Sequence, residues 1–286
     1  MRSTILLAAV LALGAGACGT EHELTAPASR RLPAIGSGRP ATDHVVVTNL
    51  ACGDLITTDV RLEADLTCPG DALFVGADGI RINLNGHIIT GAATGVGITV
   101  RGRIDVTIHG GTIMNFVTGV FVSQSTGVTV KDNAFTQNRE AVFLIGSSGN
   151  VVKANVAWEN SSRGIMLRPT TSGIPSTDNL VVANVIIDNP SGILIFGQSG
   201  NTLKGNTISG SSVGAFDLTG GGGTGNVIKE NDLSGSAAGI KFGTGWTGNL
   251  IIGNTIHTNT CGLAGPSASN TYKDNVFSSN GSDVCP

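Results

Sequence analysis

The chain has 286 residues, of which 42 are glycine, 4% are aromatic and 13% are charged, about half the roughly 25% charged fraction of soluble domains. Its 40% hydrophobic content supports a packed core, and its glycines do not recur at every third position, so the composition excludes both a disordered chain and a collagen-like one. A net charge of −3 and an isoelectric point near 5.9 provide no basic field, which excludes nucleic acid as the main partner.

Residues 1–17 have the layout of a secretory signal peptide. A short basic start at Arg2 precedes an apolar run, Ile5–Leu13, and small residues continue to Ala17. The apolar run is too short to span a bilayer. The sequence therefore predicts export, with two possible processing routes.

The first route is lipidation of Cys18, which follows Ala15-Gly16-Ala17; the second is ordinary cleavage after an A-x-A pattern and secretion. The chain has five cysteines, so lipidating Cys18 leaves an even number, whereas leaving Cys18 free gives an odd thiol in an oxidising compartment. The favoured interpretation is a lipoprotein of the bacterial cell envelope, in contact with the membrane through its anchor only.

Residues 18–44 are rich in Ala, Pro, Ser and Arg and have no apolar period, so we expect a flexible linker. A folded domain is expected over residues 45–286.

This domain contains a repeat of about 22 residues. An Asn followed two residues later by an apolar residue recurs with spacings of 22, 29, 22, 25, 23 and 21 residues. The members of this first ladder are Asn133, Asn155, Asn184, Asn206, Asn231, Asn254 and Asn275. A second ladder lies five residues earlier in most repeats, at Asn150, Asn179, Asn201, Asn226, Asn249 and Asn270.

Each repeat consists of short alternating segments separated by Gly or Asn, which tolerate positive φ angles. No segment has a helical period, so each strand must pair with the equivalent strand of the next repeat. The spacing predicts an all-β, single-stranded, right-handed parallel β-helix of roughly nine to ten coils. Leucine-rich repeats have a similar period, but Val, Ile and Thr dominate here instead of Leu.

The ends of such a stack expose edge strands and need caps. Cys52 and Cys68 flank the first coil, and Cys261 and Cys285 lie one coil apart at the last. We therefore expect disulfides between Cys52 and Cys68 and between Cys261 and Cys285.

The strings GNTLKGNTISG, GNLIIGNTI and DLTCPGDALFVGADGIRINLNGHIITG resemble the Asn-rich repeats and Cys-bearing first coil of the right-handed parallel β-helix repeat family. The resemblance covers roughly residues 45–285 and includes the periplasmic accessory protein of nitrous oxide reductase. It implies the pectate-lyase-like fold, which serves lyases, hydrolases, epimerases, tailspikes and adhesins alike, so it does not imply one activity.

Catalytic motifs of these relatives are not found in the sequence. The Asn-Thr-Asp, Asp-Asp, Gly-His-Gly and Arg-Ile-Lys motifs of polygalacturonase-type hydrolysis do not occur. The single tyrosine, Tyr272, falls in an inward register, which is unsuitable for epimerase-type proton abstraction. His87 and His109 lie in different registers, so no metal pair and no cofactor are expected.

Five lysines share one register position, two residues before the first Asn ladder. They are Lys131, Lys153, Lys204, Lys229 and Lys273. The column is either a track for an anionic polymer such as a uronate polysaccharide or a means of keeping an outward strand soluble, and the adjacent acids Asp132, Glu230 and Asp274 favour the second.

A second outward strand carries an apolar stripe, predicted to contain Phe121, Phe143, Met166, Leu194 and Phe216 with Ile145, Phe196 and Leu218 two positions on. Such a stripe is a sugar or partner surface, or is covered by a loop or a second copy; coverage or oligomerisation is favoured.

The turns after this strand are enlarged near residues 168–179 and 220–226, and enlarged loops of solenoids often build the binding face. Arg168, Asp217 and Lys241 are the catalytic candidates there, with Asp217 expected where other repeats place an inward apolar residue. Asp178 and Trp246 are further ligand-binding candidates.

The favoured function is a cell-envelope lipoprotein that binds carbohydrate or a surface partner without catalysis. The alternatives are a lyase or hydrolase of uronate-type polysaccharides, and a structural or adhesive surface protein.

Overall fold

The computed structural model describes residues 46–47 and 49–286. The predicted signal peptide (1–17), the linker (18–44) and Cys18 lie outside the described residues. Within the described part of the chain every regular element is a β-strand, and no helix is long and apolar enough to cross a membrane.

The strands form three parallel sheets, which we call A, B and C. Sheet A contains β1 (Val46–Val47), β3 (Val60–Arg61), β6 (Arg81–Asn83), β9 (Thr107–His109), β12 (Thr129–Lys131), β15 (Val151–Lys153), β18 (Leu180–Val182), β21 (Thr202–Lys204), β24 (Val227–Lys229), β27 (Leu250–Ile252) and β30 (Thr271–Lys273). Sheet B contains β2 (Asp54–Ile56), β5 (Leu73–Val75), β8 (Val96–Arg101), β11 (Thr118–Ser123), β14 (Glu140–Ile145), β17 (Arg163–Arg168), β20 (Ser191–Phe196), β23 (Gly214–Thr219), β26 (Ala238–Phe242), β29 (Cys261–Ala264) and β32 (Ser282–Cys285). Sheet C contains β4 (Leu66–Thr67), β7 (Ile88–Thr90), β10 (Thr112–Met114), β13 (Ala134–Thr136), β16 (Val156–Trp158), β19 (Val185–Ile187), β22 (Thr207–Ser209), β25 (Asp232–Ser234), β28 (Thr255–His257) and β31 (Val276–Ser278).

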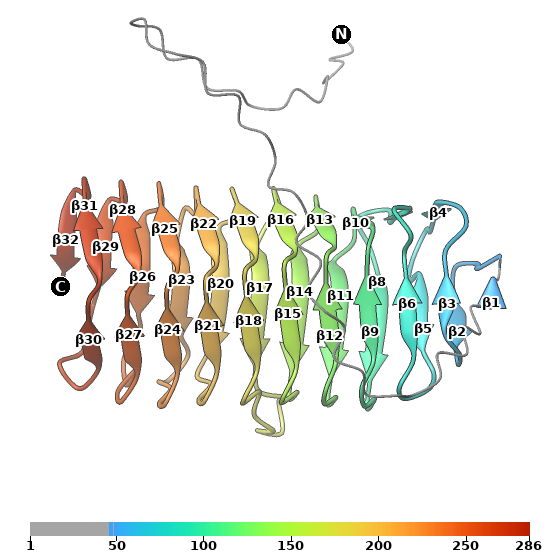
Figure 1. Cartoon of the computed structure of the whole chain (residues 1–286), viewed down its shortest axis with the longest axis horizontal. Helices are drawn as coiled ribbons and strands as arrows, with labels where there is room; N and C mark the ends of the chain where they lie inside the picture. Colours follow the sequence, from blue (N-terminus) through green and yellow to red (C-terminus); the bar gives the residue numbers. More distant parts are fainter. Residues whose placement is uncertain (1–45, 48) are drawn as a thin grey trace, which may run out of the picture. The chain divides into compact units, whose positions relative to one another are not determined.

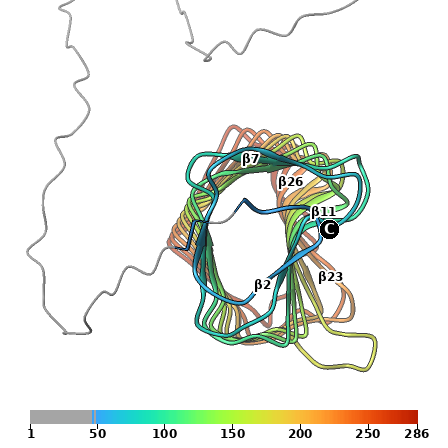
Figure 2. The ribbon, with the colours of Figure 1, turned by 90° about the vertical axis from the view of Figure 1, so that its right-hand side faces the viewer.

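The chain visits sheets B, A and C in that order and then repeats the circuit, and each strand pairs only with equivalent strands one turn before and after it. The result is a parallel β-helix of about ten turns, which confirms the fold predicted from the sequence. Figure 1 shows the turns stacked along the long axis, and Figure 2 looks down the stack.

Apolar side chains from all three sheets meet inside the coil. In sheet B, Val120 pairs in register with Val142, and Val142 with Ile165. In sheet A, Val130 pairs with Val152, and all these side chains are buried. These side chains form the core of the coil, and alternation places the neighbouring residues of each strand on the outside.

Polar ladders occupy the corners of the coil. The two predicted asparagine ladders are present: the first lies at the corner from sheet A to sheet C, and the second lies at the corner from sheet B to sheet A. A third ladder, which the sequence analysis missed, fills the corner from C to B. Its members are Asn138, Asn160, Asn189, Ser211, Ser236, Asn259 and Asn280.

The residue before a ladder position often adopts the left-handed backbone conformation. Before the first ladder, φ is 55° at Asp132, 53° at Ala154 and 54° at Ala183. Each corner therefore requires a conformation that glycine adopts most easily, which accounts for the high glycine content in structural terms.

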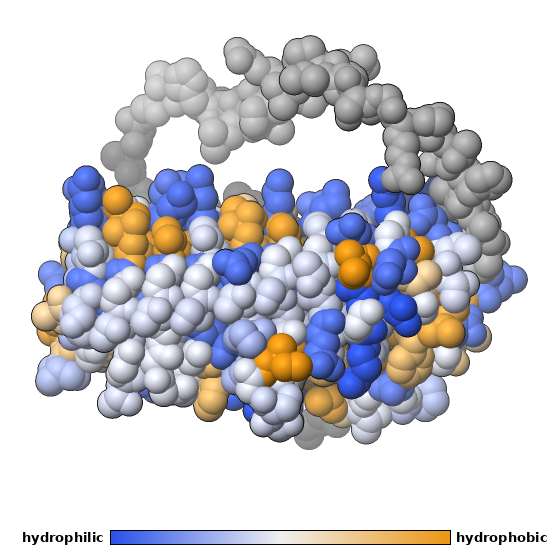
Figure 3. Space-filling model, turned by 90° about the horizontal axis from the view of Figure 1, so that it is seen from below, coloured by the Kyte–Doolittle hydropathy of each residue, from blue (hydrophilic) through white to orange (hydrophobic). Residues whose placement is uncertain are grey.

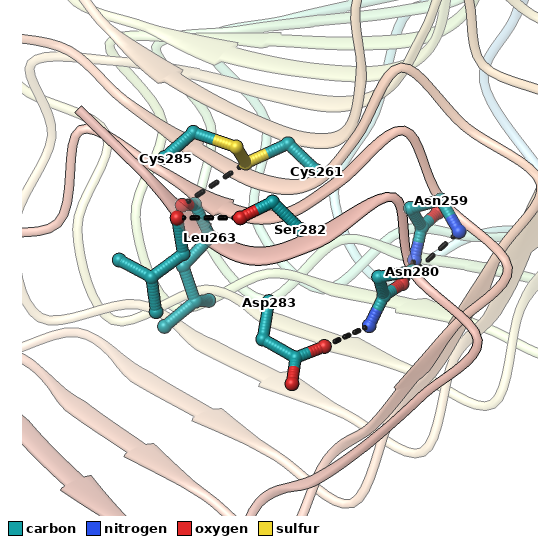
Figure 4. The surroundings of a disulfide bond; sticks show 8 residues. Asn259, Cys261, Leu263, Asn280, Ser282, Asp283 and Cys285 are labelled. Atoms are coloured by element: carbon teal, nitrogen blue, oxygen red, sulfur yellow. Dashed lines mark hydrogen bonds between the residues drawn. A yellow bond between two sulfur atoms is a disulfide. The ribbon is translucent and has the colours of Figure 1, made fainter.

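Both predicted disulfides are present near the ends of the stack. Cys52 bonds to Cys68 near the first coil, and Cys261 bonds to Cys285 between β29 and β32. Figure 4 shows the second disulfide beside the last pair of the third ladder, Asn259 and Asn280.

Two corners between sheets B and A are enlarged, at residues 169–178 and 220–225. In Figure 2 they project beyond the other corners, next to the end of sheet B. The longer loop is closed internally, because Thr170 donates its backbone N–H to Ile174 O at 2.9 Å and Ser176 Oγ donates to Arg168 O at 2.8 Å. Both loops lie along the edge of sheet B at which its strands end.

Candidate functional site on the outward face of sheet B

The outward face of sheet B presents a central column of side chains in register. Its members are Leu55, Phe74, Thr99, Phe121, Phe143, Met166, Leu194, Asp217, Lys241 and Ala264. The stretch from Phe121 to Leu194 is apolar, as the sequence predicted, and the column then continues with the charged pair Asp217 and Lys241.

The predicted register was wrong for β23. Phe216 pairs with Ile193 and Ile240 and is fully buried in the core, whereas Asp217 lies outward beside Leu194. The sequence offers two adjacent small residues, Gly214 and Ala215, for the position that Gly192 and Gly239 occupy in the neighbouring strands. Ala215 occupies that position, so every later residue of β23 moves to the opposite face. Leu218 is accordingly inward as well.

A groove of about 450 Å³, the sheet-B groove, lies over the first part of this face. Its floor contains Phe74, Phe121 and Phe143, with Asp71 toward the start of the strands and Arg101 and Arg103 toward their end. Phe121 and Phe143 contact each other edge to face, with 5.4 Å between ring centroids and 69° between ring planes. Aromatic rings in a concave surface bordered by a few polar groups are typical of ligand sites.

The arginines of the groove are held differently. The guanidinium carbon of Arg101 lies 5.7 Å from the ring centroid of Phe121, close enough for a cation–π interaction. Arg103 donates from Nε to Val75 O at 3.3 Å, and its Nη1 lies 3.9 Å from Asp78 Oδ1. Arg101 is exposed and makes no ion pair with any described residue, so its N–H groups can donate to a ligand.

Next to the groove, Glu140 forms a buried ion-pair cluster at the start of β14. Arg163 Nη1 lies 3.1 Å and Arg139 Nε 3.3 Å from its Oε1, and Thr118 Oγ1 donates to its Oε2 at 3.4 Å. Glu140 is 4% exposed, so two cations and a hydroxyl satisfy this carboxylate inside the protein. The cluster is consistent with a structural role at the edge of the face.

The structure brings Asp217 and Lys241 together but not Arg168. Asp217 and Lys241 are register partners on β23 and β26, and Ser191 Oγ donates to Asp217 Oδ2 at 3.1 Å. Asp217 is buried and Lys241 is exposed. Arg168 lies two turns earlier, at the end of β17, where its guanidinium carbon is 5.9 Å from the ring centroid of Phe196.

The buried carboxylates on this face are too far apart to act as a pair. Glu140 lies three turns before Asp217, and three strand spacings amount to roughly 14 Å. Glycoside hydrolysis by two carboxyl groups needs separations of about 5 to 9.5 Å. Across the face, these two acids therefore do not form such a pair.

The lysine column is present on sheet A. Lys131 pairs with Lys153 and Lys204 with Lys229, and the register extends the column backward through His109 to Arg61. We refer to the five lysines, His109 and Arg61 together as the lysine column.

Acids at the neighbouring corner offset much of its charge. Lys131 lies 3.5 Å from Asp132, and Lys204 lies 3.3 Å from Glu230. Lys273 lies 3.9 Å from an acid of the same corner, Asp274. These exposed pairs favour a solubilising role for the lysine column.

Of the two remaining ligand candidates, the structure contradicts one. Asp178 is exposed at the end of the 169–178 loop. Trp246 is 1% exposed and belongs to the core, because its indole packs over Gly223, where a side chain would meet the ring. Trp246 is therefore not available to stack on a ligand.

The three histidines among the described residues lie apart, two of them beside an acid. His87 Nδ1 lies 3.0 Å from Asp65 Oδ1, and His257 Nε2 lies 2.9 Å from Asp232 Oδ1. Hydrogen bonds from Ile88 N–H and then from His87 lower the pKa of Asp65. His109 stands in the lysine column. Over residues 46–47 and 49–286, no three His, Cys, Asp or Glu side chains are grouped as metal ligands.

Solved structures with the same fold include several proteins that act on polysaccharides. The A-module of the Azotobacter vinelandii mannuronan C-5 epimerase AlgE4 has a TM-score of 0.60 at 19% identity, covering 82% of this chain and 77% of that one. An alginate lyase from Paenibacillus sp. str. FPU-7 has a TM-score of 0.56 at 13% identity, covering 83% and 94%.

The tailspike protein of E. coli bacteriophage HK620, in complex with a hexasaccharide, has a TM-score of 0.59 at 11% identity, covering 78% of this chain and 50% of that one. At these identities the similarity shows the fold alone. No curated protein matches the sequence significantly.

A family profile gives the more specific match. The family described as "Periplasmic copper-binding protein (NosD)" matches residues 67–221 and 170–285, which together cover more than half of the chain. This agrees with the resemblance of the asparagine-rich repeats. The chain belongs to this NosD family of parallel β-helix proteins.

Proposed function

We propose that this protein is exported to the cell envelope and binds carbohydrate in the sheet-B groove without catalysing a reaction on it. The observation that carries the proposal is the floor of Phe74, Phe121 and Phe143 beside an exposed Arg101 in a surface hollow of about 450 Å³. The apolar face of a pyranose ring packs on an aromatic ring, while its hydroxyls require polar groups at the edges.

The polar edges of the groove are suited to that ligand. Asp71 and Thr118 lie on one side and Arg101 and Arg103 on the other. The likeness to an alginate lyase, an alginate-type epimerase and a sugar-bound tailspike supports a carbohydrate partner, although it extends to the fold only.

Binding without turnover is favoured because the buried carboxylates of the face are three turns apart. The one arrangement that favours an enzyme is the Asp217–Lys241 pair, which combines a buried acid with an adjacent amine. Such an enzyme would cleave a uronate-type polymer, so the binding experiment must also measure reaction products.

The proposal is tested by affinity measurements on a panel of neutral and acidic polysaccharides with the double variant Phe121→Ala/Phe143→Ala. We expect the affinity to fall about tenfold or more, which corresponds to about 1.4 kcal/mol. Trp158→Ala is the matched control, because Trp158 is a partly exposed aromatic residue on sheet C, away from the groove. Equal affinity of both variants and the wild type would overturn the proposed site. New reducing or unsaturated chain ends that disappear in Asp217→Asn would establish the enzyme instead.

Location in the envelope is supported by the family, which is described as periplasmic. We further propose that Cys18 carries the lipid anchor. The mature N-terminus then has the mass of a diacylated or triacylated Cys18, and an unmodified N-terminus beyond residue 17 would show secretion without an anchor.

Copper, which the family description names, fits poorly to the His and Cys donors of the described residues. Copper sites use imidazole nitrogens and sulfur ligands. His87 and His257 each lie against an acid, His109 lies among cations, and Cys52, Cys68, Cys261 and Cys285 are all in disulfides. No step of the proposed function involves copper.

A further inference from the structure

The arginines Arg101 and Arg168 occupy one column along the end of the sheet-B strands, which we call the arginine edge. From the two positions we propose that the ligand of the sheet-B groove is a linear acidic oligosaccharide, with one anionic group bound at Arg101 and another at Arg168. This inference rests on the proposed carbohydrate function and assigns its ligand class.

The register fixes the spacing of the two arginines. Arg101 pairs with Ser123, Ser123 with Ile145, and Ile145 with Arg168. Three strand spacings separate Arg101 from Arg168, which amounts to roughly 14 Å along the stack. A ligand that contacts both must extend along the helix axis, parallel to the line from Phe121 to Met166.

Each guanidinium group lies near an aromatic ring. The guanidinium carbon of Arg101 lies 5.7 Å from the ring centroid of Phe121, and that of Arg168 lies 5.9 Å from the centroid of Phe196. A cation–π contact leaves the N–H groups of a guanidinium able to donate to a ligand. Such an arginine can donate two parallel hydrogen bonds to a carboxylate or sulfate.

Neither arginine forms an ion pair with a carboxylate in the described part of the chain. Arg61, Arg103, Arg139 and Arg163 each lie within 4 Å of a carboxylate oxygen, at separations from 3.1 to 3.9 Å. Arg101 and Arg168 make no ion pair with a described residue. Arg168 Nε is in addition buried without a hydrogen-bond partner. Arg101 lines the groove, and Arg168 lies one turn beyond its last lining strand, β14. Unpaired cations at these positions favour an anionic ligand.

The opposite edge of the face carries acids, but they are already bound. Glu140 is neutralised by Arg139 and Arg163, and Asp71 Oδ1 accepts the backbone N–H of Val96 at 2.8 Å. The opposite edge therefore presents no free acid at these two positions that would repel an anionic ligand.

An enlarged loop borders the arginine edge at Arg168. Residues 169–178 follow Arg168 directly, and their polar side chains Thr170, Thr171 and Ser172 lie on the surface of the corner. Figure 3 shows the broad, nearly neutral band that the Ser, Thr and Gly corners form on this side of the molecule. Hydroxyls and backbone amides here provide neutral hydrogen-bond donors for sugar hydroxyls without repelling an anion.

The test uses oligouronates of increasing length and their carboxyl-reduced neutral counterparts as probes. Arg101→Gln and Arg168→Gln are each expected to weaken binding of a long oligouronate about tenfold, and the double variant about a hundredfold. A disaccharide is too short to reach both positions, so for it the double variant should show no more loss than the stronger single variant.

Arg81→Gln is the matched control, because Arg81 is an exposed arginine on β6 of sheet A without an ion pair to a described residue. It should retain wild-type affinity. Arg101→Lys and Arg168→Lys keep the positive charge but lose the planar guanidinium group. They should therefore bind more tightly than the Gln variants but less tightly than the wild type. Unchanged β-sheet circular dichroism shows that each variant is folded.

Three results would overturn the inference. If the carboxyl-reduced oligomers bind as tightly as the acidic ones, the ligand is a neutral glycan, and the proposed function stands without the acidic class. If Arg81→Gln weakens binding as much as the other variants, the effect is general electrostatics. If no glycan binds the wild-type protein, or if Phe121→Ala/Phe143→Ala leaves the measured affinity unchanged, the proposed function fails together with this inference.

Discussion

The side-chain oxygen of Asn155 accepts two hydrogen bonds from Asn133, one turn earlier: one from the backbone N–H at 3.1 Å and one from Nδ2 at 3.2 Å. The Nδ2 of Asn155 in turn donates to Val130 O at 2.9 Å and to Asn184 Oδ1 at 3.1 Å. Each ladder amide thus satisfies the corner amides of adjacent turns, so buried backbone groups are paired where no strand pairing reaches them.

Removing one amide from the middle of this ladder should be costly. In Asn206→Ala, the backbone N–H and Nδ2 of Asn184 lose their acceptor, and Val181 O loses its donor. Each buried polar group left unpaired costs about 1–3 kcal/mol, so we expect a loss of about 3 kcal/mol or more in the free energy of unfolding, measured by urea titration. Asn49→Ala, at an exposed position, should change it little. A midpoint unchanged in Asn206→Ala would contradict the structural role of the ladder.

A small residue stands at the second position of the long sheet-B strands from β8 to β29, for example Gly192 in β20. A Cβ added at Gly192 would lie 2.5 Å from Ala215 O and would also meet Ile208. Gly192→Val should therefore destabilise the protein by about 1–3 kcal/mol through overpacking, measured as a shift of the thermal midpoint. Gly70→Ala is the control, because nothing lies within 4 Å of the added atom. Equal midpoints for the two variants would show that the coil relaxes at this point.

The disulfide between Cys261 and Cys285 holds the last strand of sheet B, β32, on β29 (Figure 4). It closes a loop across a sequence separation of 24 residues, for which the chain-entropy model gives about 3 kcal/mol. Cys261→Ala/Cys285→Ala should lower the unfolding free energy by about that amount. It should also raise the hydrogen-exchange rates of residues 271–285 more than those of the central turns. Uniform exchange along the stack would indicate that the terminal turn does not depend on the bond.

The pH dependence of stability should include a contribution from His109. Burial, and then the positive charge of Lys131, lower the pKa of His109 below its ordinary value of 6.5. The unfolded chain therefore binds the proton more readily than the native protein below that pH. The contribution of His109 is fully present above pH 6.5 and is lost as the pH falls toward its native pKa.

This prediction is checked by following the His109 ring signals by NMR during a pH titration. Lys131→Gln should move the pKa upward and reduce the loss of stability on acidification. A pKa that does not change in this variant would mean that burial alone sets it.

Much of the fold could be predicted because the 22-residue period and the asparagine ladders repeat along the chain, and because the four domain cysteines lie at its two ends. The third ladder was missed although Asn138, Asn160 and Asn189 each follow a first-ladder Asn by five residues, because Ser211 and Ser236 interrupt the series. Serine accepts the same backbone N–H bond, so the position is defined by hydrogen bonding rather than by residue type.

The site was harder to predict. Placing Asp217 depended on a choice between Gly214 and Ala215 as the first residue of the strand, and a shift of one residue exchanges the two faces. The arginine edge joins Arg101 to Arg168, which are far apart in the sequence and share one column only once the turns are stacked in register. Trp246 was assigned to the surface because the space above Gly223 cannot be read from the sequence.

The loop at residues 169–178 shows how the molecule handles added chain. Across it, Asn150 N–H reaches Asn179 Oδ1 at 3.0 Å over 29 residues, while Asn138 N–H reaches Asn160 Oδ1 at the same distance over 22 residues. The extra residues of the loop therefore do not change the length of the hydrogen bond that joins one turn to the next. A foreign peptide grafted between Arg168 and Ser176 should therefore be displayed at the corner between sheets B and A, with the turns beneath it keeping their spacing.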